Sequence, residues 1–160
     1  MMEDNKTRKF ITPQQALLKA QKYCAYQERS QQEVRDKLYS LELHKKDVEQ
    51  IIAELITSGF LKEERFALAF AGGKFRMKGW GRIKIKKALR QKDISENLIK
   101  QALKSIDDFE YKRTLKKIIE ERIQQVKEPN LQKKNYKIAQ YAISKGFEPE
   151  LVWQLFTDRN

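Results

Sequence analysis

The sequence predicts an all-α protein, with three tandem three-helix repeats that form an elongated, curved helical array. Only six Gly and three Pro occur in 160 residues, which is too few for a typical β-sandwich or a flexible linker protein. Residue types that favour helix starts and stops divide the chain into short segments, and apolar residues recur within them at helical spacing. No segment alternates apolar and polar residues in the manner of a strand.

Residues 12–59 predict three short helices. The first begins with Thr12 as N-cap and Pro13 at the first helical position, and a glutamine completes a capping box. The second begins at Ser30 with a glutamate three residues later, which is a second capping box. The third has an apolar residue every three or four positions and ends at Gly59, a residue type common just after a helix.

Residues 60–106 predict three more helices. One runs from about Lys62 to a break at Lys78-Gly79-Trp80-Gly81. The next has a narrow apolar face, and the third begins after Ser95, which is a favourable N-cap.

Residues 107–156 predict the last three helices. Asp107 and Asp108 favour the start of a long helix because carboxylates are stabilised at helix N-termini. Gly146 ends the second helix, and Pro149 opens the third.

Self-similarity along the chain supports this grouping. A shift of 51 positions places six apolar residues of the first set on apolar residues of the second, and a shift of 53 places five of these on the third. Neighbouring repeats are expected to pack on one another, because each is too small for a large core. The expected organisation is a flexible N-terminus, three repeats and a C-terminal tail, at residues 1–11, 12–59, 60–106, 107–156 and 157–160.

Charge is concentrated in the second repeat. The chain has 34 Lys and Arg against 22 Asp and Glu, a formal net charge of +12. Residues 60–106 hold 13 of these basic residues and four acids, and nine basic residues with no acid lie between Lys74 and Lys92. A solvated helix face usually mixes charges of both signs, so this block favours a surface for an anionic partner over one that serves solubility alone.

Several classes of chemistry lack the residues that they need. One Cys and one His exclude an internal disulfide framework and a cysteine-based zinc site, and we expect no metal and no cofactor. Adjacent carboxylates such as Glu63-Glu64 point in different directions on a helix, so they do not form an acid–base pair. We therefore expect a protein that is not an enzyme. No apolar run is long enough to span a membrane and no signal peptide is evident, which favours a soluble cytoplasmic protein.

Three central segments of the chain form a recognisable pattern, and they are Phe60-Leu61-Lys62-Glu63-Glu64-Arg65-Phe66-Ala67, Lys78-Gly79-Trp80-Gly81-Arg82-Ile83 and Leu89-Arg90-Gln91-Lys92-Asp93-Ile94. Together with the upstream residues Ser30 to Leu38, these segments resemble the RecX family of regulatory proteins. The likeness covers about residues 12–156, although the third repeat matches only in pattern. Two departures are Lys62-Glu63-Glu64, where the family has an Asp-rich turn, and Gly72-Gly73, where better helix formers are expected.

The resemblance implies a specific function. RecX proteins bind the RecA recombinase, chiefly its filament on single-stranded DNA, and block its recombinase and coprotease activities, which affects DNA repair, recombination and the SOS response. Their fold is three tandem three-helix repeats. Some members also contact DNA directly, and for this chain that contact stays open. The expected partners are RecA and its single-stranded DNA filament, and the chain is expected to be a monomer.

The second repeat holds the candidate binding surface. Arg82, Lys86 and Arg90 recur at i, i+4 and i+8 beside the apolar face, and such a stripe can face phosphates or an acidic groove of a nucleoprotein filament. A variant with these three residues changed to alanine is expected to fold normally and inhibit weakly. The candidate residues for RecA-filament or DNA binding are Lys74, Arg76, Lys78, Trp80, Arg82, Lys84, Lys86, Lys87 and Arg90.

Three residues whose side chains could act in binding or catalysis also have simpler structural interpretations. Trp80 can stack on a base or fill a repeat junction, and the junction is favoured slightly. Trp153 follows an apolar residue on a helix and is expected in the core. Cys24 is expected to be a small buried hydrophobe and not a nucleophile.

The alternative function is a sequence-tolerant nucleic-acid-binding helical module that acts without RecA. Binding to naked single-stranded DNA does not separate the two functions, because a strongly basic protein can bind it in either case.

Overall fold

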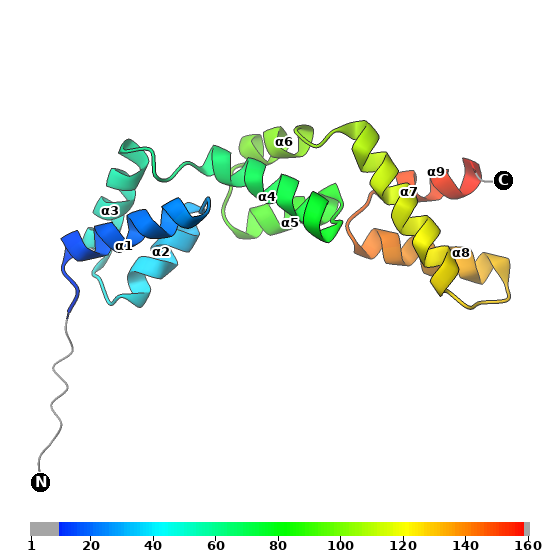
Figure 1. Cartoon of the computed structure of the whole chain (residues 1–160), viewed down its shortest axis with the longest axis horizontal. Helices are drawn as coiled ribbons and strands as arrows, with labels where there is room; N and C mark the ends of the chain where they lie inside the picture. Colours follow the sequence, from blue (N-terminus) through cyan, green and yellow to red (C-terminus); the bar gives the residue numbers. More distant parts are fainter. Residues whose placement is uncertain (1–9, 159–160) are drawn as a thin grey trace, which may run out of the picture. The chain divides into compact units, whose positions relative to one another are not determined.

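The structure is a computed structural model, and it describes residues 10–158. All regular secondary structure in this range is α-helical, which confirms the predicted fold class (Figure 1). The helices are α1 Pro13–Tyr26, α2 Gln31–Ser40, α3 Lys45–Thr57, α4 Glu63–Lys78, α5 Arg82–Gln91, α6 Glu96–Lys104, α7 Asp108–Gln125, α8 Leu131–Ser144 and α9 Pro149–Asp158.

The chain forms two compact units, which divide between Phe66 and Ala67. In unit 1, α1, α2 and α3 pack on one another. Thr12 and Gln15 form the expected reciprocal capping box, and the Ser30 hydroxyl accepts a hydrogen bond from the Glu33 N–H at 3.1 Å. Caps of this kind satisfy backbone N–H groups that lack a partner within the helix. The core of unit 1 contains Ala16, Ala20, Cys24, Val34, Leu38, Val48, Ile51, Ile52, Leu55 and Leu61.

Cys24 lies in this core, as the sequence predicts. Its residue is 7% exposed, and burial raises the pKa of its thiol. Because the thiolate is the nucleophilic form, this environment suppresses cysteine reactivity.

Unit 2 contains α5 to α9 and the part of α4 that follows Phe66. Helices α5 and α6 pack together, and α8 packs against both α7 and α9. The aromatic rings of Phe75, Tyr111 and Phe147 connect the second and third helix sets through centroid distances of 5.8 and 5.1 Å. The buried apolar side chains of unit 2 also include Ile85, Leu89, Ile99, Leu115, Ile119, Ile138 and Val152.

The backbone repeats with the same shifts as the apolar pattern. Helices α3, α6 and α9 begin at residues 45, 96 and 149, which differ by 51 and then 53 positions. The residue in the turn before each of these helices has a positive φ: 63° at Glu42, 57° at Asp93 and 100° at Gly146. A left-handed residue after a helix allows the chain to reverse, so the three turns share one geometry.

Some local predictions differ from the structure. Trp153 is 40% exposed, so its assignment to the core is wrong. On α9 the buried positions are Val152 and Phe156, which are four residues apart, and the next residue after Val152 is rotated about 100° from that face. Helix α4 continues through Gly72 and Gly73.

The predicted termini lie partly outside the structure. Residues 1–9 and 159–160 lie outside the described range, while residues 157 and 158, which the sequence assigns to the tail, belong to α9. Among residues 10–158, no helix is both long and apolar enough to cross a membrane.

Candidate functional site

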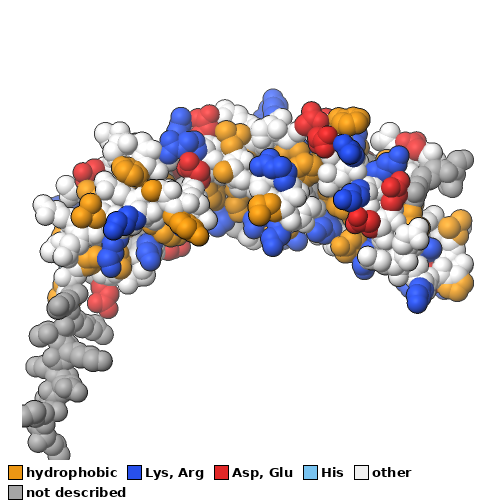
Figure 2. Space-filling model, viewed as in Figure 1, with side chains coloured by type: hydrophobic (Ala, Val, Ile, Leu, Met, Phe, Trp, Pro, Cys, Tyr) orange, Lys and Arg blue, Asp and Glu red, His pale blue; other side chains and the backbone are white. Residues whose placement is uncertain are grey.

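The nine candidate residues all lie in unit 2, on three consecutive pieces of chain. Lys74, Arg76 and Lys78 occupy the second half of α4, Trp80 is in the following turn, and the other five are on α5. Ile85 and Leu89 bury one face of α5, and the basic residues of this short helix are partly or fully exposed. In Figure 2, blue Lys and Arg side chains gather along the lower edge of the region that Figure 1 labels α4 to α6.

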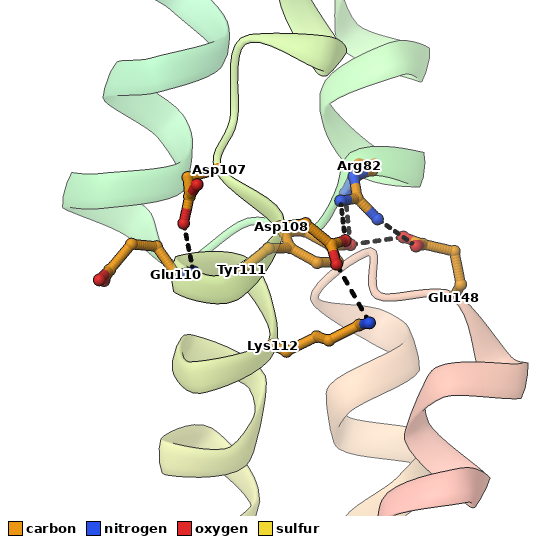
Figure 3. Close-up of polar contacts among 7 residues, drawn as sticks. All are labelled: Arg82, Asp107, Asp108, Glu110, Tyr111, Lys112 and Glu148. Carbon is orange, nitrogen blue, oxygen red and sulfur yellow. Dashed lines mark hydrogen bonds and ion pairs between the residues drawn. The ribbon is translucent and has the colours of Figure 1, made fainter.

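The structure separates Arg82 from this surface and places it in a junction between helix sets (Figure 3). Its guanidinium Nη1 lies 2.9 Å from Glu148 Oε2, and its Nη2 lies 3.1 Å from Asp108 Oδ1. The guanidinium also lies over the Tyr111 ring, 3.8 Å from its centroid. These contacts use the charge and the flat face of Arg82 within the protein.

Tyr111 completes the junction. Its side chain is buried, and its hydroxyl accepts a hydrogen bond from the Arg82 backbone N–H at 3.0 Å and donates one to Glu148. Burial, followed by the hydrogen bond to Glu148, raises the pKa of the Tyr111 phenol. The phenol therefore remains a hydrogen-bond donor at neutral pH.

Backbone contacts join the same helix sets. The N–H of Gly81 donates to the Lys145 carbonyl at 2.8 Å, and the N–H of Ile83 donates to the Gly146 carbonyl at 3.0 Å. The Lys145 ammonium donates to the Lys78 carbonyl at 2.7 Å. The N–H groups of the N-cap residue Gly81 and of Ile83 in the first turn of α5 are thus satisfied by the chain at the end of α8, while the Arg82 N–H donates to Tyr111.

Arg90 also has a carboxylate partner. Its Nε and Nη2 donate to the two oxygens of Glu96 at 2.6 and 3.2 Å, a bidentate contact between the end of α5 and the start of α6. This pair lowers the pKa of the Glu96 carboxyl. The predicted stripe of Arg82, Lys86 and Arg90 therefore contains two arginines that already pair within the protein. Replacing Arg82 with alanine would remove contacts of the junction, so the triple alanine variant does not test the surface alone.

The lysines of α5 differ from its arginines. Within residues 10–158, Lys84, Lys86 and Lys87 form no ion pair with a carboxylate. Their charges are therefore more available to an external anion than those of Arg82 and Arg90. Lys74 and Lys84 instead lie near Trp80, with their Nζ atoms 4.9 and 4.7 Å from a ring centroid of its indole. We call Lys84, Lys86 and Lys87 the α5 lysines.

A polar cavity of about 560 Å³ brings residues of the third helix set beside the end of α4. Arg76 and Lys78 line this cavity, and so do Glu110 and Glu121. Three further basic residues, which the sequence did not single out, also line it. The Arg122 guanidinium stacks over the Tyr141 ring at 4.1 Å to its centroid. No local motif signals this grouping, because the third set is nearly balanced in charge. The added basic residues are Lys117, Arg122 and Lys145.

The described residues contain no group of three or more His, Cys, Asp and Glu side chains that could hold a metal ion. On α5, the two arginines pair with carboxylates of the protein, whereas the α5 lysines form no ion pair with a carboxylate among the described residues.

Comparison with known proteins identifies both helix sets that carry the resemblance. Residues 16–55 match the family model described as "RecX, first three-helix domain", and residues 63–103 match "RecX, second three-helix domain". The regulatory protein RecX of Clostridium tetani is 32% identical over 130 residues, which cover 80% of this chain and 59% of that protein. RecX of Prosthecochloris aestuarii is 32% identical over 106 residues, 66% of each chain. The chain thus spans about half to two thirds of the length of these and other curated relatives.

Solved structures show the same fold. The crystal structure of RecX from Lactobacillus salivarius superposes with a TM-score of 0.81 at 25% identity, covering 91% of this chain and 95% of that one. A second RecX crystal structure has a TM-score of 0.79 at 22% identity and covers 99% of this chain.

Proposed function

Because the chain belongs to the RecX family of regulatory proteins, we propose that it binds RecA, chiefly as the filament on single-stranded DNA, and inhibits its recombinase and coprotease activities. The observation that carries the proposal is the match of two successive three-helix domains to the family. The proposed role is regulatory and non-enzymatic and affects recombination, DNA repair and the SOS response. The proposal includes a cytoplasmic location and a monomeric state.

The α5 lysines support this role. A RecA filament on single-stranded DNA carries the phosphates of the DNA, and the α5 lysines form no ion pair with a carboxylate among the described residues. Electrostatic attraction raises the rate of encounter and holds the protein near the filament, whereas close packing at other residues provides specificity. Lysines act as point charges on phosphates and do not read base sequence, so the proposed binding is independent of DNA sequence.

Filament binding can be separated from general DNA binding by salt. We expect the protein to sediment with RecA filaments, assembled on long single-stranded DNA with a slowly hydrolysed ATP analogue, at salt concentrations where it no longer binds the same DNA without RecA. Binding to DNA alone weakens steeply with salt because it rests on counterion release, whereas protein–protein packing does not.

The control is RecA without DNA at the same concentrations. If the protein dissociated from filaments and from naked DNA at the same salt concentration, this result would contradict the proposal. It would favour the alternative of a sequence-tolerant nucleic-acid-binding module that acts without RecA.

A further inference from the structure

Trp80 lines a cavity of about 440 Å³ between α5 and the end of α8, where Gly146 of the following turn also lines it. A cavity of this volume is within the range of small-molecule sites. The side chains of Ile83, Ala88 and Ile143 contribute apolar walls, and Lys84 and Lys87 line it as well. An aromatic ring, apolar walls and ammonium groups therefore lie around one space.

The indole of Trp80 is held in place but is only half-buried. Phe70 contacts it in an edge-to-face arrangement, with 6.4 Å between ring centroids. The Nζ atoms of Lys74 and Lys84 lie within 5 Å of its ring centroid, which is the distance of a cation–π contact. Such contacts are weak at exposed sites, so these ammonium groups can move to a phosphate while the ring keeps its position.

The lysines around Trp80 favour an anionic ligand. Within the described part of the chain, Lys74, Lys84 and Lys87 form no ion pair with a carboxylate. The carboxylates of an acidic peptide would pair with these lysines, but they would not stack on the indole ring. A nucleotide supplies both partners, because its base has a π-face that stacks on aromatic side chains and its phosphate pairs with lysine.

We propose that Trp80, Lys74, Lys84 and Lys87 form a docking site for an unpaired nucleotide of a nucleic-acid single strand. The base stacks on the indole at the mouth of the cavity, and the neighbouring phosphates contact the three ammonium groups. The site accepts any base, because stacking depends on the π-face and not on the base edge. A duplex does not fit, since its bases remain stacked on one another. The site assigns a single-stranded nucleic acid as a ligand of the surface used in the proposed function. It rests on the proposed function only in taking the RecA filament as the place where the protein meets such a strand.

The chain allows a direct optical test, because Trp80 and Trp153 are its two tryptophans. The variant Trp153→Phe leaves Trp80 as the reporter. We expect its fluorescence to be quenched by a thymine oligonucleotide, with a signal that saturates together with binding measured by anisotropy of a dye on the oligonucleotide. An oligonucleotide of the same length with abasic sites tests charge without bases, and a duplex of equal charge tests strandedness.

Unchanged Trp80 fluorescence at saturation with the thymine oligonucleotide would overturn the site, as would equal quenching by the abasic strand or the duplex. In the same background, Trp80→Ala is expected to weaken binding of the thymine strand about tenfold, with little effect on the abasic strand. Trp80→Phe is expected to retain most of the binding and guards against misfolding of the alanine variant. Equal losses for both strands in Trp80→Ala would also overturn the site. None of these measurements contains RecA, so their failure is distinct from failure of the proposed function.

Discussion

Replacement of Gly81 by alanine is expected to lower the free energy of unfolding of unit 2 by about 3 kcal/mol, the upper end of the usual cost of overpacking. A Cβ at Gly81 would lie 2.3 Å from both the carbonyl carbon of Gly146 and the N of Phe147. These are backbone atoms, so no side-chain rotation relieves the contact. The φ of Gly81 is −79°, which any residue adopts, so the cost is steric and not conformational.

The clash would also open the junction between the second and third helix sets. The hydrogen bonds from Gly81 to Lys145 and from Ile83 to Gly146 lie at the point of contact, at 2.8 and 3.0 Å. Each backbone hydrogen bond contributes about 1 kcal/mol, and loss of a buried partner costs more. We therefore expect the contacts of Arg82 to weaken together with the backbone contacts.

Urea unfolding followed by tryptophan fluorescence measures this effect in the correct unit, because both tryptophans lie in unit 2. Gly73→Ala is the matched control. Gly73 lies in α4, and a Cβ there would meet no atom within 4 Å. Alanine is favoured over glycine inside a helix by about 0.5–1 kcal/mol, so this variant should be slightly more stable. Equal midpoints for Gly81→Ala and the unchanged protein would contradict the described junction.

Changing the α5 lysines to glutamine is expected to raise the concentration needed for half-maximal inhibition of RecA by about tenfold or more. Each exposed ion pair contributes up to about 1 kcal/mol, and three lost together correspond to one or two powers of ten in affinity. Stability should change little, because Lys84, Lys86 and Lys87 pair with no carboxylate among the described residues. The measurement is a titration of RecA strand exchange with each variant.

The matched control changes Lys19, Lys22 and Lys46 to glutamine. These lysines are exposed on α1 and α3 of unit 1, and their replacement removes the same total charge. If both triple variants lost inhibition equally, net charge and not the α5 surface would be the cause. If the α5 variant inhibited as well as the unchanged protein, the assigned surface would be wrong.

The local structure followed closely from the sequence, because helix caps act over three or four residues. Thr12, Ser30 and Asp107 each accept the backbone hydrogen bond expected of an N-cap. The shifts of 51 and 53 positions also recur in the backbone, at the turns before α3, α6 and α9. These features depend on neighbours in the chain, so periodicity and cap chemistry were enough.

The sequence could not predict which basic residues pair within the protein and which form no ion pair with a carboxylate. Arg82 and Glu148 are 66 positions apart, and their pairing depends on how α5 meets the end of α8. Arg82 and Lys86 look equivalent in a helical projection, but the structure places Arg82 in a junction and leaves Lys86 without an ion-pair partner in the described chain. Trp153 was misplaced for a related reason, since one residue along a helix changes the face by about 100°.

The most direct test of the central proposal is DNA-dependent ATP hydrolysis by the cognate RecA, titrated with this protein at fixed salt and with excess single-stranded DNA. The excess removes simple competition for DNA, so an effect must act on the filament. We predict that hydrolysis falls at protein concentrations well below that of RecA. Unchanged hydrolysis, with binding to DNA intact in a separate assay, would contradict the proposed inhibition of RecA.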